Sequence, residues 1–255
     1  MQTETENDGK GYHKETMKEQ DTWKQLAGEE AAKRIEDGMV VGLGTGSTTQ
    51  YLLYALARRI AGGLRIAGAV PTSKATEHLA RDLAIPLTDL DAHPQLDLAI
   101  DGADEIDPQL RLIKGGGGAL LREKIVASSA RRFIVIGDVT KQVRILGSSF
   151  PLPVEVVPFA ATPVRKRLEA LGALGALGAI GPSVQLRHSP PEQLFVTDNG
   201  NVILDCLFPG GISDPDVLDL AIKQIVGVVE SGLFLHMAQE AIIGGPDGVT
   251  LVQPA

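Results

Sequence analysis

Hydrophobic positions in the first 150 residues follow two alternating patterns, one typical of helices and one typical of buried strands. Trp23, Ala27, Ala31 and Ile35 recur at every fourth position, which predicts a helix that ends at Gly38. Short apolar runs bounded by polar turns are typical of strands in a parallel sheet. The predicted strands are 39–43, 64–70, 85–87, 96–100 and 133–137, and the predicted helices are 47–61, 75–83 and 119–131. This alternation predicts an α/β fold with a doubly wound, mostly parallel, Rossmann-like sheet.

The pattern changes beyond Pro153, where strands and helices no longer alternate regularly. A strand over 154–157, a helix over 163–171, a hairpin over 195–204 and a helix over 217–225 predict a small α+β unit. The hairpin rests on the Asp198-Asn199-Gly200 turn between two β-rich runs. A Leu-Gly-Ala repeat within 171–181 fits neither period, and we interpret it as a helix end and loop. Residues 242–251 are expected to return to the main sheet as a hairpin.

The chain is therefore expected to have three parts. Residues 1–20 are polar and predict a disordered extension. Residues 21–149 together with 230–255 are expected to form the main α/β catalytic domain, and residues 150–229 the small inserted α+β domain.

Composition and charge limit the setting in which the protein works. The chain has 255 residues and a formal net charge of −8, which disfavours nucleic acid and anionic membranes as partners. The single cysteine, Cys206, excludes an internal disulfide, and its apolar neighbours predict a small buried side chain rather than a reactive thiol. No apolar run is long enough to span a bilayer, and residues 1–20 lack the apolar stretch of a signal peptide. We therefore expect a cytoplasmic protein.

A glycine-rich turn over residues 42–49 joins a predicted strand to a predicted helix. This order directs free helix N–H groups and the positive end of the helix dipole at an anion. The turn is neither the dinucleotide fingerprint nor the ATP-binding loop, because its third glycine comes one residue early and Ser47, not lysine, follows Gly46. It could hold a smaller phosphate, with hydroxyls of Thr45, Ser47 and Thr48 adding donors. The alternative is a plain helix cap formed by Ser47 or Thr48.

An acidic strand end carries the strongest chemical signal. Asp101, Asp104, Glu105 and Asp107 fall within seven positions, and Lys114 and a run of glycines follow closely. Ligands of open α/β sheets bind outside the carboxyl ends of the strands, and a lysine beside bare amides can stabilise a developing anion. The spacing does not fit a calcium loop, which needs oxygens at alternate positions and glycine at the sixth. A magnesium site or a solvated turn remains possible from the spacing alone.

Seven motifs in order resemble the type A ribose-5-phosphate isomerase family, and the resemblance runs from residue 24 to residue 252. The motifs are Gly42-Leu43-Gly44-Thr45-Gly46-Ser47-Thr48, Asp101-Gly102-Ala103-Asp104-Glu105, Lys114-Gly115-Gly116-Gly117-Gly118-Ala119, Arg122-Glu123-Lys124, Lys141-Gln142-Val143, Pro151-Leu152-Pro153-Val154-Glu155-Val156 and Thr197-Asp198-Asn199-Gly200-Asn201.

This resemblance implies an aldose–ketose isomerase of the non-oxidative pentose phosphate pathway. Such an enzyme interconverts D-ribose 5-phosphate and D-ribulose 5-phosphate through an enediolate, without metal or cofactor, as a homodimer or homotetramer. The implied catalytic residues are Glu123, Asp101, Asp104 and Lys114. The implied substrate- and phosphate-binding residues are Lys24, Thr45, Gly46, Ser47, Thr48, Gly115, Gly116, Gly117, Gly118 and Lys141.

The residue types suit that mechanism. Asp101 and Asp104 could move the protons that open the sugar ring. Glu123 would then carry a proton between C2 and C1, which works best if its pKa is raised toward the working pH. Lys114 and the amides of residues 115–118 would stabilise the enediolate.

The chain departs from the family pattern in three places, and two other functions remain open. The departures are the N-terminal extension, an apparent insertion formed by the Leu-Gly-Ala run and residues 181–188, and Thr72-Ser73 where some relatives carry consecutive serines. A sugar-phosphate-sensing regulator could share the fold, although the acidic polar N-terminus offers no element that reads DNA. A coenzyme A transferase would use a glutamate as nucleophile.

Overall fold

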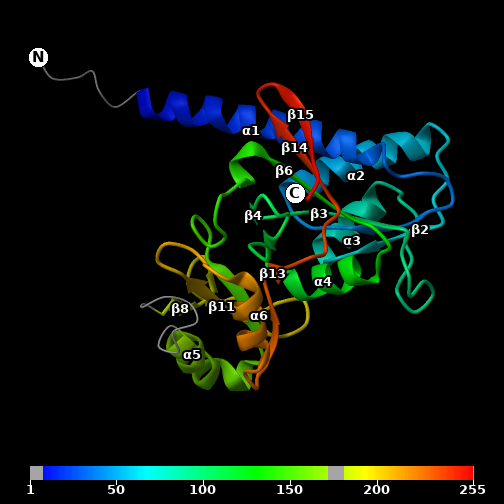
Figure 1. Ribbon diagram of the computed structural model, residues 1–255. Helices are drawn as coiled ribbons and strands as arrows, with labels where there is room; N and C mark the ends of the chain where they lie inside the picture. Colours follow the sequence, from blue (N-terminus) through cyan, green and yellow to red (C-terminus); the bar gives the residue numbers. More distant parts are fainter. Residues whose placement is uncertain (1–7, 172–180, 255) are drawn as a thin grey trace, which may run out of the picture.

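The computed structural model describes residues 8–171 and 181–254, and a parallel sheet forms its centre (Figure 1). Six strands lie in the order β15-β14-β6-β3-β1-β2, and all neighbours are parallel except the pair β14 and β15. This confirms the doubly wound α/β fold. The strands are β1 (Val40–Leu43), β2 (Gly68–Pro71), β3 (Leu98–Gly102), β6 (Phe133–Asp138), β14 (Glu240–Gly245) and β15 (Gly248–Val252).

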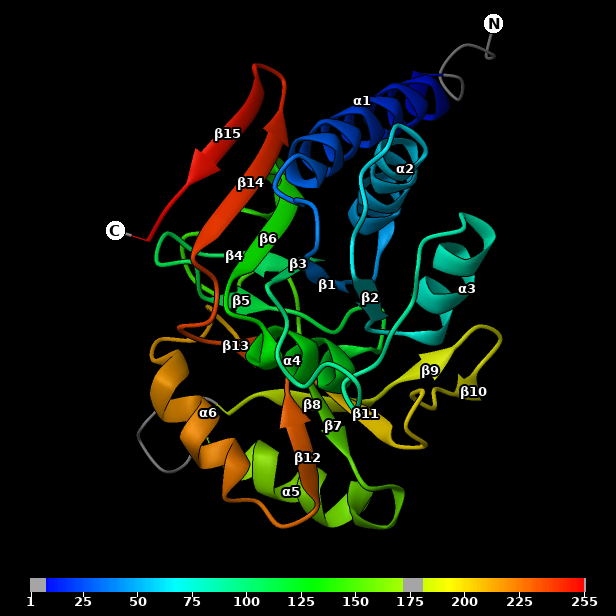
Figure 2. The same ribbon diagram turned by 90° about the vertical axis from the view of Figure 1, so that its right-hand side faces the viewer.

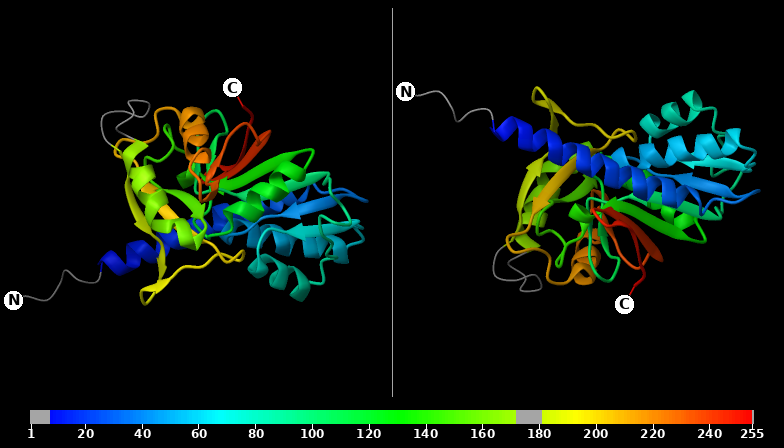
Figure 3. Two further views of the ribbon diagram at one scale, coloured as in Figure 1. Left: turned by 90° about the horizontal axis from the view of Figure 1, so that it is seen from below. Right: turned by 90° about the horizontal axis from the view of Figure 1, so that it is seen from above.

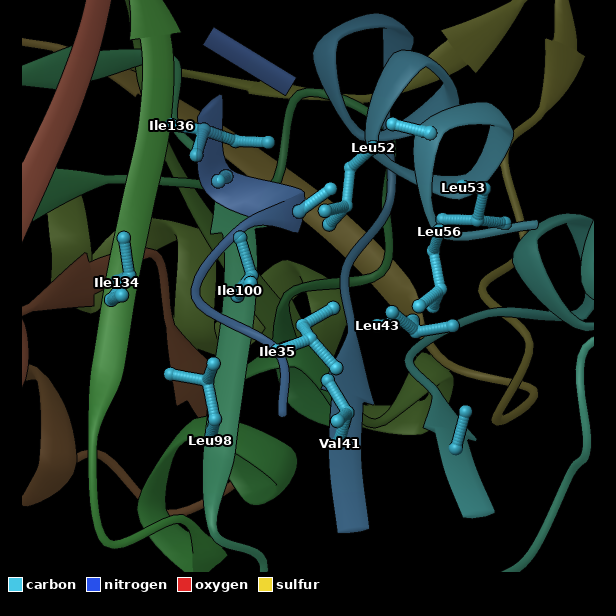
Figure 4. Packing of buried hydrophobic residues seen from close by; sticks show 14 of the residues in the cluster. Ile35, Val41, Leu43, Leu52, Leu53, Leu56, Leu98, Ile100, Ile134 and Ile136 are labelled. Atoms are coloured by element: carbon cyan, nitrogen blue, oxygen red, sulfur yellow. The ribbon is translucent and has the colours of Figure 1, made fainter. Parts of the chain in front are cut away.

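Helices cover both faces of this sheet. Leu52, Leu53 and Leu56 of α2 pack with α1 against Leu43 and Ile100, on one face of the sheet (Figure 4). The intervening strand residues point to the other face, where α4 and a three-stranded antiparallel sheet cover them. These elements are α1 (Asp8–Ala32), α2 (Ser47–Ala61), α3 (Lys74–Asp82), α4 (Leu120–Ser129), β4 (Glu105–Ile106), β5 (Leu112–Ile113) and β13 (Leu233–Phe234).

A second antiparallel sheet forms the core of the small domain (Figure 2). Its strand order is β12-β7-β11-β8, and α5 and α6 pack their apolar faces against it. The domain division stays a prediction, and β12 of this sheet extends two residues beyond the predicted boundary at position 229. The elements are β7 (Leu152–Val156), α5 (Ala161–Ala170), β8 (Ser183–Leu186), β9 (His188–Ser189), β10 (Gln193–Leu194), β11 (Val202–Leu207), α6 (Pro215–Lys223) and β12 (Val228–Ser231). Two 3-10 turns are η1 (Val139–Lys141) and η2 (Pro158–Ala160).

The predicted hairpin over 195–204 is wrong. The strand β11 pairs instead with β7 and β8, and the preceding residues form a loop. A buried carboxylate organises this loop, because Oε1 of Glu155 accepts hydrogen bonds from side chains of Thr197, Asn199 and Asn201 at 2.9, 3.3 and 2.9 Å. The final hairpin of β14 and β15 is confirmed on the edge of the main sheet.

Two other expectations differ from the structure. A disordered extension was expected over residues 1–20, but residues 8–20 form the first part of α1, which crosses the molecule in the view from above (Figure 3). Residues 1–7 lie outside the described residues. Residues 183–186 are the strand β8 of the small sheet, so this segment is an integral strand and not a simple insertion. Most of the Leu-Gly-Ala repeat lies outside the described residues.

Cys206 is completely buried, as expected from its apolar neighbours, and burial raises the pKa of its thiol. Among the described helices, none is both long and apolar enough to cross a membrane. Within residues 8–171 and 181–254, no three His, Cys, Asp or Glu side chains cluster so that they could hold a metal ion.

Candidate active site

A cleft opens at the carboxyl ends of β1, β3 and β6. Segments that follow these three strands form one side of the cleft, as expected for an open α/β sheet, and the glycine loop after β5 forms the other. The open space between them measures about 500 Å³, including its solvent-exposed mouth. The cleft is lined by Thr45, Gly46, Ser47, Thr48, Gly102, Ala103, Asp104, Lys114, Gly115, Gly116, Gly117, Glu123 and Lys141.

The glycine-rich turn at one end of the cleft leaves the first amides of α2 uncapped. Gly46 precedes the helix with φ of +117°, which favours glycine, and no side chain caps this end. The alternative of a plain cap formed by Ser47 or Thr48 is therefore wrong. Gly44 is needed for close approach, because a Cβ there would lie 2.0 Å from Oδ1 of Asp101. The turn thus presents N–H groups and the positive end of the α2 dipole to the cleft.

The hydroxyl of Thr45 points away from this end of the cleft. It lies 2.8 Å from the hydroxyl oxygens of both Thr72 and Ser73, and 3.1 Å from that of Thr76. These contacts fix the turn to the start of α3. They give Thr72 and Ser73 a supporting position behind the turn. Ser47 and Thr48 also line the cleft, and their hydroxyls make no hydrogen bond with the described residues, so these two can bind a ligand.

A buried triad of Lys114, Asp101 and Glu123 lies at the centre. Nζ of Lys114 is 3.1 Å from Oδ2 of Asp101 and 3.3 Å from Oε1 of Glu123, and it also donates to the carbonyl of Gly102. Oδ1 of Asp101 accepts from the N–H groups of Thr45 and Gly102 at 3.0 and 2.7 Å. All three triad side chains are almost completely buried.

Two carboxylates share one ammonium in this triad, and the pKa values of both are raised. Burial, and then the negative charge of Asp101, raise the pKa of Glu123 from an ordinary 4.5 to about 8, against the opposing effect of Lys114. Burial likewise raises the pKa of Asp101. Burial alone would lower the pKa of Lys114, but its carboxylate neighbours outweigh it and raise that pKa. The lysine therefore stays charged, and a proton can enter or leave a carboxyl near neutral pH.

The glycine loop, residues 115–118, closes the cleft opposite the acidic strand end. The N–H of Gly116 donates to Oδ2 of Asp104 at 2.7 Å. In the part of the chain that the structure describes, the N–H of Gly117 has no hydrogen-bond partner. Gly118 packs instead against the ring of Phe195, since a Cβ on Gly118 would lie 2.2 Å from its Cζ.

Most of the expected site residues therefore meet in one place, with three exceptions. Asp101 lies behind the lining and touches it through Lys114. Gly118 backs the loop without lining the cleft. Lys24 lies on α1 outside the lining residues, and its ammonium is 3.6 Å from a carboxylate oxygen of Asp21.

Two side chains near the site were missed by the sequence analysis. The ring of Phe234, fully buried, lies 5.4 Å from Nζ of Lys114 and 4.8 Å from Nζ of Lys124. The guanidinium of Arg187 donates to the carbonyls of Gly115 and Gly116 at 2.7 and 3.1 Å. Neither belongs to a motif with chemical meaning, and only the folded chain brings them to the cleft.

Comparisons with known proteins agree on one family. A family model described as ribose 5-phosphate isomerase A (phosphoriboisomerase A) matches residues 68–248. A relative from Roseiflexus sp. (strain RS-1), named ribose-5-phosphate isomerase A, is 55% identical over 229 residues, which cover 89% of this chain and 94% of the relative. A protein of the same name from Bacillus mycoides (strain KBAB4) is 50% identical, covering 89% of this chain and 97% of its own.

Solved structures give the same result. The ribose 5-phosphate isomerase from Plasmodium falciparum superposes with a TM-score of 0.85 at 38% identity, covering 91% of this chain and 98% of that one. A D-ribose-5-phosphate isomerase in complex with phospho-erythronic acid has a TM-score of 0.84 at 39% identity, with the same coverage of both chains.

Proposed function

Because this chain belongs to the type A ribose-5-phosphate isomerase family, which interconverts D-ribose 5-phosphate and D-ribulose 5-phosphate, we propose that Glu123 moves the proton between C2 and C1. The observation that carries this assignment is the state of its carboxylate. Oε1 faces Lys114, whereas the buried Oε2 has no hydrogen-bond partner among the described residues. One oxygen of Asp101, Asp138 and Glu155 is likewise unpartnered there, but of these four carboxylates only Glu123 lines the cleft. A carboxylate with one uncommitted oxygen and a pKa near 8 suits a group that must take and return a proton. Membership of this family, and not the geometry of Glu123, sets aside the regulator and the coenzyme A transferase.

Ring opening precedes the proton transfer, and Asp104 is the candidate for it. Asp104 lines the cleft and is held by the N–H of Gly116, so it can exchange protons with the ring oxygen and the anomeric hydroxyl. Asp101 was expected to share this work. Since Asp101 lies behind Lys114 with Oδ1 accepting two backbone N–H groups, we assign it to the charge balance of Lys114 and Glu123.

The enediolate formed by proton removal carries negative charge beside the glycine loop. Lys114 and the free N–H of Gly117 are the donors that can receive it. Because Lys114 is buried and both donors are fixed before the reaction, they stabilise the developing charge more than water would. Removing one such donor costs about 3–4 kcal/mol in comparable sites.

The phosphate of the substrate fits the other end of the cleft. There the uncapped start of α2, the hydroxyls of Ser47 and Thr48, and Lys141 from η1 line one wall. Lys24 lies outside this wall, so its proposed role depends on movement of its side chain. Anchoring the phosphate fixes the far end of the sugar and holds C1 and C2 against Glu123. Phospho-erythronic acid combines a phosphate with a carboxylate, so we expect it to mimic the enediolate in this chain.

The test is the isomerase activity of Glu123→Gln, which keeps the shape of the side chain but cannot accept a proton. We expect kcat to fall at least about 100-fold. Glu169→Gln, on the exposed face of α5, should keep wild-type activity as a matched control. In the wild type, kcat/KM should rise with pH, reach half of its plateau near pH 8 and level off above about pH 9, because Glu123 must be ionised to act. Wild-type turnover in Glu123→Gln would remove Glu123 from its role.

We also propose that the enzyme acts in the cytoplasm as a homodimer or homotetramer, without nucleic acid or membrane partners. The net charge of −8 and the single buried cysteine support this setting.

A further inference from the structure

Arg187 reaches the active site from the small domain, where it follows β8. Its side chain is only 12% exposed. Nε donates to Oδ2 of Asp205 at 2.8 Å, and the adjacent Nη2 donates to Oδ1 of the same carboxylate. The remaining nitrogen, Nη1, donates to the carbonyls of Gly115 and Gly116. One guanidinium thus joins a carboxylate of β11 to two successive peptide groups of the glycine loop.

The geometry of the peptide bond gives these contacts a consequence in the cleft. A trans peptide is planar, so its N–H points away from its carbonyl. The carbonyls of Gly115 and Gly116 point toward Arg187, and the N–H groups of the next residues, Gly116 and Gly117, point the other way. The N–H of Gly116 indeed meets Asp104, which lines the cleft. The N–H of Gly117 is the free donor assigned above to the enediolate.

A second contact holds the same loop from the same side. The ring of Phe195 packs on Gly118, and the guanidinium carbon of Arg187 lies 5.7 Å from the centre of that ring. Gly118 has φ of +78°, a conformation that favours glycine, and the absent side chain leaves room for the ring. Arg187 therefore holds the first two residues of the loop and Phe195 packs on its last residue, and neither side chain lines the cleft.

We propose that Arg187 is a positioning residue for the isomerase reaction, which aims and polarises the amides of Gly116 and Gly117. It touches no substrate, and this inference rests on the proposed role of the glycine loop in stabilising the enediolate. A positive charge on the carbonyl side of a peptide draws electrons toward the oxygen and makes the N–H a stronger donor. Because the charge of the enediolate develops only during the reaction, such aid lowers the barrier more than it strengthens binding.

The chemistry requires arginine rather than any cation. The planar guanidinium has five donors in a fixed fork, so it can bind both oxygens of Asp205 and still donate to two carbonyls. A lysine ammonium at this place would keep the charge but could not hold both peptides in register. We therefore expect Arg187→Lys to recover only part of the function.

The test compares Arg187→Met and Arg187→Lys with Arg165→Met, a control arginine on the exposed face of α5. We expect Arg187→Met to lower kcat about 10- to 100-fold, with KM within about twofold of wild type, because misaiming a donor costs somewhat less than removing one. The inhibition constant of phospho-erythronic acid should rise by about the same factor by which kcat falls. Arg187→Lys should fall between Arg187→Met and the wild type, and Arg165→Met should match the wild type.

Concentrations of competent protein are set by calorimetric titration with inorganic phosphate, so that unfolded protein does not count as lost catalysis. A double variant, Arg187→Met with Asp205→Asn, should be no slower than Arg187→Met alone if the two side chains act as a unit.

An unchanged kcat per competent site, or a raised KM at unchanged kcat, would overturn the proposal. If Glu123→Gln is inactive while Arg187→Met is fully active, only the positioning role fails. Activity in Glu123→Gln would instead overturn the proposed function.

Discussion

Glu105 and Glu123 are two buried glutamates near the same cleft, and they differ in how their oxygens are satisfied. Oε1 of Glu105 accepts from the N–H and hydroxyl of Ser149, both at 2.7 Å, and from the N–H of Phe150 at 2.8 Å. Its Oε2 accepts from the N–H of Gly147 at 2.5 Å. Among residues 8–171 and 181–254, Glu123 has no such set of donors, and it shares one ammonium with Asp101.

The difference separates a structural carboxylate from the one that we propose to be reactive. Every oxygen of Glu105 is held by fixed donors, so its charge stabilises a loop and is unavailable for chemistry. Glu123 has an unpartnered oxygen and a raised pKa, so its carboxylate can accept a proton. Burial and residue type alone do not distinguish the two; the number and charge of the donors do.

Of the substitutions predicted here, removing the ammonium of Lys114, which Asp101 and Glu123 share, should reduce kcat/KM the most. In Lys114→Met, both Glu123 and the enediolate lose their counter-charge, so we expect kcat/KM to fall about 1,000-fold or more. Lys166→Met, which changes an exposed lysine of α5, is the matched control. Steady-state kinetics measure both. A loss below about tenfold for Lys114→Met would mean that the glycine loop stabilises the intermediate without it.

Changing each glutamate to glutamine should affect stability in opposite directions. In Glu105→Gln, the new amide N–H groups face backbone donors, and we expect the free energy of unfolding to fall by about 2–4 kcal/mol with kcat within twofold of wild type. In Glu123→Gln, we expect equal or higher stability at alkaline pH. Denaturant titrations at pH 5 and pH 8.5 measure both variants.

The pH dependence follows from the sign of the pKa shift. The pKa of Glu123 is raised on folding, so between about pH 4.5 and 8 the native state holds a proton that the unfolded state has released. The contribution of this group to wild-type stability is therefore complete below that range and is lost as pH rises through it. The advantage of Glu123→Gln over the wild type should grow from pH 5 to pH 8.5. A constant difference between the two would contradict a raised pKa.

The smallest expected effect concerns the aromatic ring beneath the cation. Phe234→Leu removes the ring face that lies near Lys114 and Lys124, and a buried cation–π contact contributes about 1–2 kcal/mol. We expect kcat/KM to fall about 3- to 10-fold. Phe159→Leu is the control, because Phe159 is 98% exposed. Equal activities of these two variants would show that Lys114 does not depend on the ring.

The sequence was sufficient for the parallel sheet and for most of the cleft. Strand ends that carry Thr45, Asp101 and Lys141 meet because parallel strands place their carboxyl ends at one edge. Such convergence can be inferred from element order alone. The glycine-rich turn was identifiable for a similar reason, since its spacing has a direct meaning for the backbone.

Arg187 and Phe234 could not be found in this way. Arg187 contacts backbone carbonyls 71 and 72 residues away, and a carbonyl is present at every residue, so the partner leaves no trace in the sequence. The wrong hairpin has a related cause. The turn signal at residues 198–200 was read correctly as a turn, but the buried Glu155, more than 40 residues away, decides how its flanks are held.

The loop over 197–201 also has a mechanical consequence. Asp198 accepts from the N–H of Lys74 at the start of α3, Asn199 accepts from Arg122 of α4, and Glu155 holds the loop to the small domain. These hydrogen bonds join the small domain to the main domain beside the cleft. Local unfolding of the small domain would break these hydrogen bonds and free the glycine loop at the same time. On heating or in denaturant, isomerase activity should therefore be lost before the central sheet unfolds.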